Sequence, residues 1–237
     1  MNRLVKAFAC LSTALYRQAL INHSVAACVE HEPVLKVLNC RTVVDVGANR
    51  GQFALVARRC YPSARIISFE PLPLPAARLG EVFSADANVA LHQVAIGPEP
   101  GHSTIHISGK DDSSSLLPIG ARQSALFPGT AEVEVANVRV GPLDEFLVAD
   151  HIASPALLKL DVQGYELQAL KGCAALLERF AYVYVECSFA ELYAGQALAD
   201  EVIAWLRERG FRLRGVHNMS YDSGGRVIQG DFLFGRE

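Results

Sequence analysis

The chain has 237 residues, of which 51% are hydrophobic and 20% charged, and its formal net charge at pH 7 is -3. A chain of this length can bury one complete hydrophobic core, so we expect one catalytic domain with a short appendage. The sequence holds no block of Lys and Arg. Because binding to a phosphate backbone needs clustered cations, the composition argues against nucleic acid as the main partner, and a small or neutral substrate is favoured.

Six cysteines are spread along the chain, at positions 10, 28, 40, 60, 173 and 187. They form no Cys-x-x-Cys pair, and their spacing suits neither a zinc site nor a small disulfide framework. We interpret them as reduced core thiols, and this predicts a cytoplasmic protein.

Residues 1–40 are predicted to form an N-terminal helical cap, separate from a catalytic domain at residues 41–237. Apolar residues of the first segment recur at helical spacing, namely Leu4, Phe8, Leu11 and Leu15. This favours an amphipathic helix over a signal peptide, although the residues before Cys28 superficially resemble a lipoprotein cleavage site. A second helical segment, from about Ser24, is disturbed by Pro33. No run approaches the roughly twenty apolar residues of a membrane span. The cap is a candidate contact in a homo-oligomer.

After residue 41, short apolar runs alternate with helical patterns, which is typical of strand–helix–strand units on a parallel sheet. Strands are predicted at residues 42–46, 65–69, 89–96, 156–160 and 182–187, and helices at 52–60, 76–83, 165–179 and 195–209. The last two strands, 211–216 and 227–234, flank a glycine turn and are expected to pair antiparallel at the sheet end. Residues 97–141 break the alternation and are interpreted as an insertion or flexible lid, with short strands at 104–107 and 133–140.

A glycine turn follows the first predicted strand, where an open parallel sheet binds its ligands. Gly47 and Gly51 can adopt backbone conformations closed to other residues, and Asn49 tolerates them. The turn lacks the Gly-x-Gly-x-x-Gly pattern of dinucleotide sites and the Gly-Lys-Ser/Thr of a P-loop. An acid at Asp45 repels phosphates but suits a cofactor with an ammonium and a sulfonium group. Glu70, about twenty residues on, can accept hydrogen bonds from ribose hydroxyls. S-adenosylmethionine is therefore the favoured cofactor; alternatively, both acids only cap helices.

Four segments together resemble the FkbM family of methyltransferases, namely Val43–Gln52, Phe69–Pro71, Leu158–Glu166 and Val185–Ser188. The resemblance covers residues 42–235, and Lys-x-Asp-x-x-Gly-x-Glu is its most specific part. It implies an α/β fold of the class I methyltransferase type, a Rossmann-like, seven-stranded, mostly parallel sheet with an antiparallel last strand. It also implies methyl transfer to a hydroxyl, often on a sugar or a natural product. Gln163 replaces the glutamate usual in this family, which weakens any role that needs a carboxylate there.

The predicted cofactor contacts are Asp45, Gly47, Asn49, Gly51, Gln52, Glu70, Pro71, Ala95 and Asp161. In this arrangement Glu70 holds the ribose, the glycine turn holds the methionine end, and the backbone near Ala95 borders the adenine. A strand-end carboxylate that faces the crevice lies where ligand groups converge, so Asp161 is expected to align or deprotonate the acceptor, although it could instead cap the next helix.

The further catalytic candidates are Glu186 and His217, each near the end of a predicted strand, although a histidine at the latter position could equally lie in a surface loop. Lys159 shares a strand face with Asp161 because side chains alternate along a strand. As a buried charge it needs a partner, and either Asp161 or Glu166 could supply one. A structural ion pair and a catalytic role for this lysine stay open.

Three alternatives remain. Asp161, Glu186 and Asp231 could bind magnesium through hard oxygen ligands, but three carboxylates on separate strands are a weak signal, and no metal is predicted. The chain could be an NAD-dependent oxidoreductase on a similar sheet, or a catalytically silent cofactor-binding scaffold. Ser113–Ser115 could contact the cofactor or form a solvated loop. The sequence favours an S-adenosylmethionine-dependent O-methyltransferase that acts on a small molecule or glycan, and it leaves the acceptor unnamed.

Overall fold

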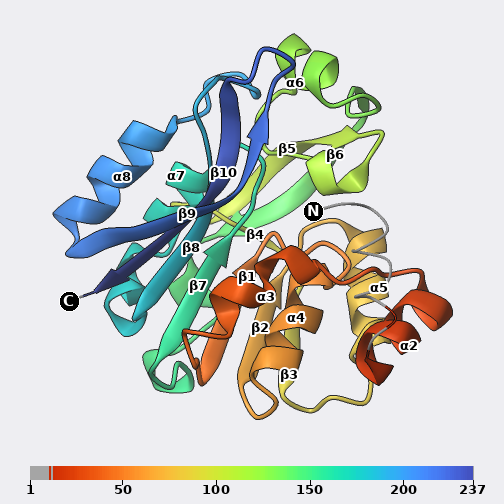
Figure 1. Ribbon diagram of the computed structural model, residues 1–237, viewed down its shortest axis with the longest axis vertical. Helices are drawn as coiled ribbons and strands as arrows, with labels where there is room; N and C mark the ends of the chain where they lie inside the picture. The colour runs from red at the N-terminus through yellow and green to blue at the C-terminus, as the bar shows by residue number, and fades with distance from the viewer. Residues whose placement is uncertain (1–10, 12, 237) are drawn as a thin grey trace.

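The computed structural model describes residue 11 and residues 13–236, and its centre is a sheet of seven strands (Figure 1). In chain order these are β1 (Thr42–Val46), β2 (Arg65–Phe69), β3 (Val89–His92), β7 (Ala156–Leu160), β8 (Tyr182–Ser188), β9 (Phe211–Tyr221) and β10 (Val227–Arg236). Their order across the sheet is β3-β2-β1-β7-β8-β10-β9. The first five run parallel, whereas β10 pairs antiparallel with β8 and β9. The predicted class I methyltransferase sheet with an antiparallel last strand is confirmed.

Helices cover both faces of the sheet and give a three-layer molecule (Figure 1). On one face lie α2 (Ala14–His23), α3 (Glu32–Leu35), α4 (Gln52–Cys60) and α5 (Pro73–Val82), and on the other lie α7 (Glu166–Gly172) and α8 (Ala199–Glu208). Successive strand residues face opposite sides, so each strand contributes to two cores. In β1, for example, Val43 packs with the α4 side, while Val44 and Val46 pack with the α7 side.

The described part of the N-terminal segment packs on the core of the α4 side. α2 follows Thr13, whose hydroxyl accepts a hydrogen bond from the backbone of Tyr16 at 3.3 Å. Tyr16, Val25 and Leu35 are almost fully buried in the same cluster as residues of β1 and α4. This segment therefore stabilises the catalytic fold directly, because burial of large apolar side chains is worth roughly 1.5–3 kcal/mol each.

The helical pattern predicted for this segment is only partly recovered. Leu15 is half-buried against the core, whereas Leu11 is 46% exposed, and Leu4 and Phe8 lie outside the described residues. Pro33 lies in the first turn of α3, where a missing N–H costs nothing, so it begins a short helix instead of interrupting a long one. The suggested role in a homo-oligomer stays a prediction.

The insertion forms a second, three-stranded sheet and a short helix. Its strands are β4 (Ala95–Ile96), β5 (Gly101–Ser108) and β6 (Glu132–Gly141), in the order β4-β6-β5, and the helix is α6 (Ala121–Leu126). The two strands predicted inside it are confirmed and pair antiparallel. The single strand predicted at 89–96 is wrong, because the chain leaves the main sheet after His92. The N–H of Val94 turns back to the carbonyl of His92 at 3.0 Å, and β4 then pairs with β6.

Two predicted helices are shorter than their apolar patterns indicated. α7 ends at Gly172 and a 3-10 segment, η5 (Ala174–Arg179), replaces its second half. A Cβ atom at Gly172 would lie 2.4 Å from the carbonyl oxygen of Gly97, so a glycine is required where the insertion crosses this helix. α8 begins only after Leu198, whose N–H donates to the side chain of Glu201 at 2.9 Å and caps the first turn.

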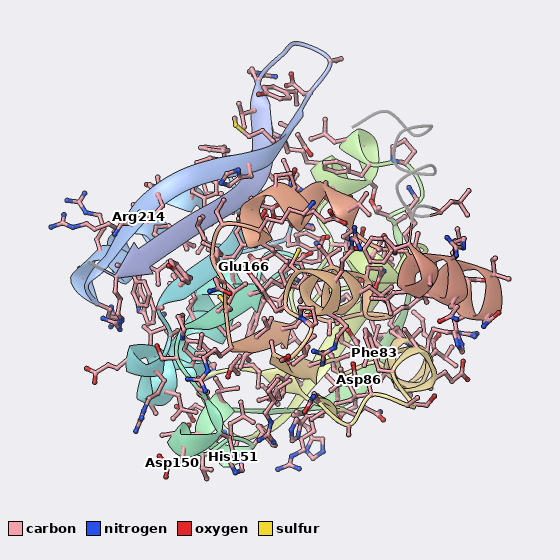
Figure 2. All side chains as sticks on the ribbon, turned by 60° about the horizontal axis from the view of Figure 1, so that its bottom comes forward. Phe83, Asp86, Asp150, His151, Glu166 and Arg214 are labelled. Carbon is pink, nitrogen blue, oxygen red and sulfur yellow. The ribbon has the colours of Figure 1, made fainter. Side chains whose placement is uncertain are left out.

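The placement of β9 corrects one candidate site residue. The strand runs through Tyr221, so His217 lies inside it and pairs with Asp231 of β10 instead of standing at a strand end. Figure 2 contrasts two charged side chains: Arg214 of the same strand projects from the molecule, whereas Glu166 lies in its interior.

Of the cysteines predicted to be core thiols, Cys40, Cys173 and Cys187 are buried, Cys28 and Cys60 are half-buried, and Cys10 lies outside the described residues. None of the helices in residues 13–236 is both long and apolar enough to cross a membrane.

Candidate functional site

A cavity of about 400 Å³ lies beyond the carboxyl ends of β1, β2 and β7. Its floor is made by the segments that follow these strands, and the insertion supplies a wall through β4, β5 and residues 110–116. Ligand sites of open α/β sheets occupy this position, and their usual volumes are roughly 300–1,000 Å³. The cavity is therefore the candidate active site.

The glycine turn brings the backbone of β1 against that of β7. Gly47 has φ +78°, and a Cβ atom there would lie 2.0 Å from the carbonyl oxygen of Asp161, so no other residue fits. Asn49 also has positive φ, at 46°, as its residue type allows. Gly51, with φ +88°, is the N-cap of α4. The turn thus leaves backbone, and little side chain, at the cavity floor.

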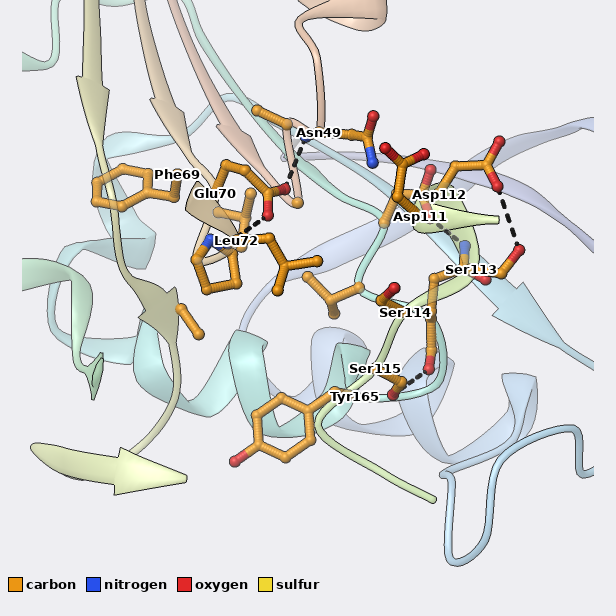
Figure 3. Close-up of a pocket in the computed structure, with 18 of the residues that line it drawn as sticks. Asn49, Phe69, Glu70, Leu72, Asp111, Asp112, Ser113, Ser114, Ser115 and Tyr165 are labelled. Carbon is orange, nitrogen blue, oxygen red and sulfur yellow. Dashed lines mark hydrogen bonds between the residues drawn. The ribbon is translucent and has the colours of Figure 1, made fainter. Parts of the chain in front are cut away.

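Glu70 is held at the edge of the cavity by two backbone groups. Its Oε2 accepts a hydrogen bond from the N–H of Asn49 at 2.9 Å, and its Oε1 accepts one from the N–H of Leu72 at 2.8 Å (Figure 3). The residue is 5% exposed, and burial raises its pKa to about 7 although both N–H groups oppose the shift. A carboxylate fixed in this way can still accept hydrogen bonds from two neighbouring hydroxyls, because each oxygen has a second lone pair.

The insertion is tied to the glycine turn by an ion pair between Arg50 and Asp111. Beyond it, residues 111–115 line the cavity, and Figure 3 shows them across from Glu70. Ser115 donates a hydrogen bond to the carbonyl of Gln163 at 2.6 Å, so this segment is anchored at both ends. The polar stretch interpreted as a lid or a solvated loop forms a wall of the site.

Lys159 forms a buried ion pair beneath the glycine turn. Its Nζ lies 3.1 Å from Asp45 Oδ1, 3.8 Å from Asp161 Oδ2 and 3.2 Å from the carbonyl oxygen of Gly47. Burial alone would lower the pKa of Lys159, but the two carboxylates outweigh it and raise that pKa above its ordinary value. The lysine is therefore a permanent cation that fixes the turn, and it cannot serve as a base.

Asp161 is the exposed member of a polar network at the end of β7. The side-chain amide of Gln163 donates to Asp161 Oδ1 at 2.7 Å and to Glu186 Oε2 at 3.2 Å, while its Oε1 accepts from the hydroxyl of Tyr193 at 2.7 Å. Gln229 donates to the other oxygen of Glu186 at 2.8 Å. The glutamine that departs from the family pattern thus bridges two carboxylates, where a glutamate would repel both.

Glu166 stabilises the turn that follows Asp161. Its Oε1 accepts hydrogen bonds from the N–H groups of Val162 at 3.1 Å and of Gly164 at 3.0 Å. Burial raises its pKa to about 7, and backbone hydrogen bonds partly oppose this. The suggested pair between this residue and Lys159 does not form, because Glu166 is engaged by the backbone.

The methyltransferase FkbM domain matches residues 45–213, which is more than half of the chain. This chain belongs to the FkbM methyltransferase family. The family is one of methyltransferases, and family and fold together imply a methyl donor. The family match therefore does not support the alternative of an NAD-dependent oxidoreductase, which the sequence had left open.

Relatives and solved structures agree with this assignment. The chain is 28% identical to the 2-O-methyltransferase NoeI of Sinorhizobium fredii over 65% of this chain and 66% of the relative. It is 29% identical to the 31-O-demethyl-FK506 methyltransferase FkbM of Streptomyces tacrolimicus, over 71% and 72%. The chain therefore spans slightly less than two thirds of the length of NoeI. A putative O-methyltransferase from Klebsiella pneumoniae shares the fold, with TM-score 0.53, 10% identity and coverage of 99% and 96%.

Most of the predicted site residues of this FkbM-family protein line the cavity: Gly47, Asn49, Gln52, Glu70, Pro71, Ala95, Lys159 and Asp161. Four others are placed away from it. Asp45 is fully buried under Lys159, Gly51 packs against Phe83 and Leu79, and neither Glu186 nor His217 is among the lining residues. The magnesium alternative is not supported, because Asp161, Glu186 and Asp231 do not converge among the described residues as a metal set would.

Several lining residues were missed by sequence reasoning. Cys28 and His31 reach the cavity from the N-terminal segment, and Gln229 reaches it from β10. No motif surrounds them, and the first two lie outside the family resemblance. Packing of the N-terminal segment on α4 and β8 brings Cys28 and His31 to the site, and the pairing of β10 with β8 brings Gln229 there.

Proposed function

We propose that this methyltransferase uses S-adenosylmethionine to methylate a hydroxyl of a small molecule or glycan. The observation that carries the proposal is the combination of Glu70 and Gly47 at one cavity. A buried carboxylate at the end of β2 offers two acceptors for a ribose, and a turn without side chains leaves room for a ligand beside it. No glycine-rich phosphate cradle accompanies them.

The cavity is chemically suited to the three parts of this donor. Glu70 would hold the ribose hydroxyls, and Phe69 and Ala95, with their apolar neighbours, would border the adenine. The turn from Gly47 to Gln52 would hold the methionine end, beside Asp161. When bound, the sulfonium supplies an activated methyl group, so the protein mainly has to orient the acceptor oxygen and remove its proton.

The charge of the lining side chains favours an uncharged acceptor. Four acids line the cavity, namely Glu70, Asp111, Asp112 and Asp161, against two cations, Lys110 and Lys159. Lys159 is already paired with two carboxylates. Because like charges in a site of low polarity repel strongly, phosphates and carboxylates are disfavoured there. The relatives' printed names, 2-O-methyltransferase and 31-O-demethyl-FK506 methyltransferase, support oxygen as the acceptor atom.

Calorimetry tests the donor. The wild type is expected to bind S-adenosylmethionine and not NAD, and Glu70→Ala is expected to weaken that binding strongly. Glu99→Ala, at an exposed position, is the matched control and should behave as the wild type. Binding of NAD, or wild-type affinity in Glu70→Ala, would refute the assignment of the donor site.

A further inference from the structure

We propose that His31 is the general base that accepts the proton of the acceptor hydroxyl, and that Asp231, Tyr184 and Asn218 hold it in place. The inference rests on the proposed function. His31 belongs to η1 (Val29–His31), before the matched family domain, and Asp231 and Asn218 follow it. The domain itself therefore lacks this histidine, which the N-terminal segment supplies.

The imidazole is fixed on one side by polar groups of the sheet. His31 Nδ1 lies 3.1 Å from the hydroxyl of Tyr184 and 3.5 Å from Asp231 Oδ2. Asn218 donates to the same Asp231 oxygen at 2.8 Å. Two rings clamp the imidazole edgewise, with centroids 5.3 Å away for Phe53 and 5.6 Å away for Tyr184. These contacts fix the orientation of the imidazole, and a base at a reacting centre must have a fixed orientation.

The position of His31 in the cavity suits the acceptor and not the nucleoside. Glu70 follows β2, whereas His31 contacts β8 and β10. In the order β2-β1-β7-β8, three strand spacings separate β2 from β8. At about 4.8 Å per spacing this is roughly 14 Å across the sheet. Asp161, after β7, lies between them. A donor that places its ribose at Glu70 and its methyl group near β1 and β7 therefore leaves the β8 side, where His31 and Gln229 line the cavity, for the acceptor.

The hydrogen-bond partners indicate which ring nitrogen is basic. Tyr184 has one proton, and its hydroxyl donates to Asp231 Oδ2 at 3.3 Å. Nδ1 of His31 lies 3.1 Å from the tyrosine oxygen, 3.5 Å from Asp231 Oδ2 and 3.3 Å from the amide nitrogen of Asn218. The two amide protons of Asn218 have acceptors in Asp231 Oδ2 at 2.8 Å and the Tyr184 oxygen at 3.4 Å, so we infer the Nδ1–H tautomer, which the nearby carboxylate favours. Nε2 is left with its lone pair. This is the arrangement in which an acid orients a histidine and the opposite nitrogen takes a proton from a hydroxyl.

The other candidate bases are less suitable. One oxygen of Asp161 is already occupied by Gln163, at 2.7 Å. Glu186 is outside the cavity lining, both its oxygens accept hydrogen bonds, and burial raises its pKa well above the ordinary value. Lys159 is held as a cation. Asp161 is then a positioning residue, and its carboxylate can accept a hydrogen bond from the acceptor.

The step balances without a further reactant. The acceptor oxygen forms a bond to the methyl carbon, and the bond between that carbon and the donor sulfur breaks with its electron pair going to sulfur. The hydroxyl proton passes to Nε2 of His31, which gives an imidazolium beside Asp231. The imidazolium then releases this proton to solvent, since the side chain is 15% exposed.

The neutral form of His31 is the ground state near pH 7. Burial lowers its pKa below the ordinary value, and Lys159 acts in the same direction, while Asp231, Glu30 and Asp161 oppose the shift. A base must be unprotonated to act, so the rate is expected to fall as the pH drops through this lowered pKa, on the acid side of the ordinary histidine value.

Nuclear magnetic resonance of [15N]histidine-labelled wild-type protein tests the tautomer without any acceptor. His31 is assigned from the signal lost in His31→Gln, and at pH 8 we expect Nδ1 protonated and Nε2 unprotonated. His23→Gln is the matched control, because His23 belongs to the same N-terminal segment but pairs with the surface residue Glu81. Protonation of Nε2 instead of Nδ1 at pH 8 would overturn the proposal.

Kinetics test the base itself, with tritiated S-adenosylmethionine and the methyl glycoside that a screen finds to be converted. His31→Gln should bind the donor as the wild type does, lose about 100-fold or more in kcat, and lose the decline of kcat at acidic pH that the wild type shows when the donor is saturating. His31→Ala should regain activity when imidazole is added, which a merely structural histidine would not allow. An unchanged pH profile with weakened donor binding would make His31 a donor ligand and refute the base. Failure of the wild type to bind the donor would instead refute the proposed function.

Discussion

The ionisation of Glu70 should make donor binding depend on pH. Its folded-state pKa of about 7 lies above the ordinary value of 4.5, because the carboxyl group is buried. Ribose hydroxyls donate hydrogen bonds to a carboxylate, so the donor binds the ionised form preferentially and shifts the equilibrium toward it. With that pKa, about 90% of Glu70 is ionised at pH 8 and about 10% at pH 6. We therefore expect affinity about tenfold lower at pH 6, or about 1.4 kcal/mol.

Isothermal titration calorimetry measures this directly. At pH 7, binding of S-adenosylmethionine should release about half a proton per site, seen as a dependence of the binding enthalpy on the ionisation enthalpy of the buffer. Glu70→Gln is the matched control, since it keeps the shape but cannot titrate. Ionisations of the donor occur with both proteins, so the difference between them reports Glu70 alone.

The sign of the effect is fixed by the direction of the shift. Because the pKa of Glu70 is raised, part of the free protein carries a proton on this carboxyl group at pH 7, and the complex with the donor releases it. The affinity for the donor must therefore rise as the pH increases through 7. Equal pH profiles for the wild type and Glu70→Gln, or wild-type affinity that falls between pH 6 and 8, would refute the assignment of Glu70 to the ribose.

Gly47→Ala should destabilise the protein by more than about 3 kcal/mol and abolish donor binding, because the added Cβ would meet the carbonyl oxygen of Asp161 at 2.0 Å. The control is Gly80→Ala, because a Cβ atom at this position in α5 would lie in open space, and this variant should be more stable than the wild type by up to about 1 kcal/mol. Chemical denaturation measures the free energy of unfolding of both variants. Equal values for Gly47→Ala and Gly80→Ala would contradict the close approach at Gly47. Asp45→Asn or Lys159→Met should each cost about 3–5 kcal/mol, because a buried charge loses its partner. The double variant should cost less than the sum, and additive losses in urea unfolding would rule out the ion pair.

Local patterns in the sequence predicted most strands of the main sheet and the glycine turn correctly. The alternation of apolar residues in 156–160 places Leu158 and Leu160 on one side of β7 and Lys159 on the other, as the two cores show. The conformational needs of Gly47 are also local, since the turn must pass close to a neighbouring strand. Such features depend on residues a few positions apart, so a single sequence contains them.

Pairings between distant segments were not predictable in the same way. Asp45 lies opposite Lys159 only because β1 and β7 are neighbours in a particular register, and the sequence did not offer it as a partner. Of the two partners that the sequence did offer, Asp161 lies 3.8 Å from Lys159, whereas Glu166 does not pair with it. The early end of the strand after His92 has the same origin, because β4 finds its partner, β6, about forty residues later in the chain. Tertiary contacts override local propensity at these places.

The N-terminal contribution to the site illustrates the limit most clearly. Nothing around His31 resembles a catalytic motif, and its partners Tyr184 and Asp231 are more than 150 residues away. The three meet because η1 and α3 pack on α4 and lie over the same face of β8 and β10. A residue of this kind is found from geometry, by asking which titratable side chains line the cavity.

Methyl transfer to a hydroxyl is the central claim, and a screen with tritiated S-adenosylmethionine over neutral methyl glycosides, uronides and sugar nucleotides tests it most directly. We expect label in at least one neutral glycoside, bound through oxygen, and its loss in Glu70→Ala. Label only in a phosphorylated or carboxylated compound would contradict the charge argument for the acceptor. A wild-type protein that neither binds the donor nor transfers its methyl group to any acceptor would contradict the account as a whole.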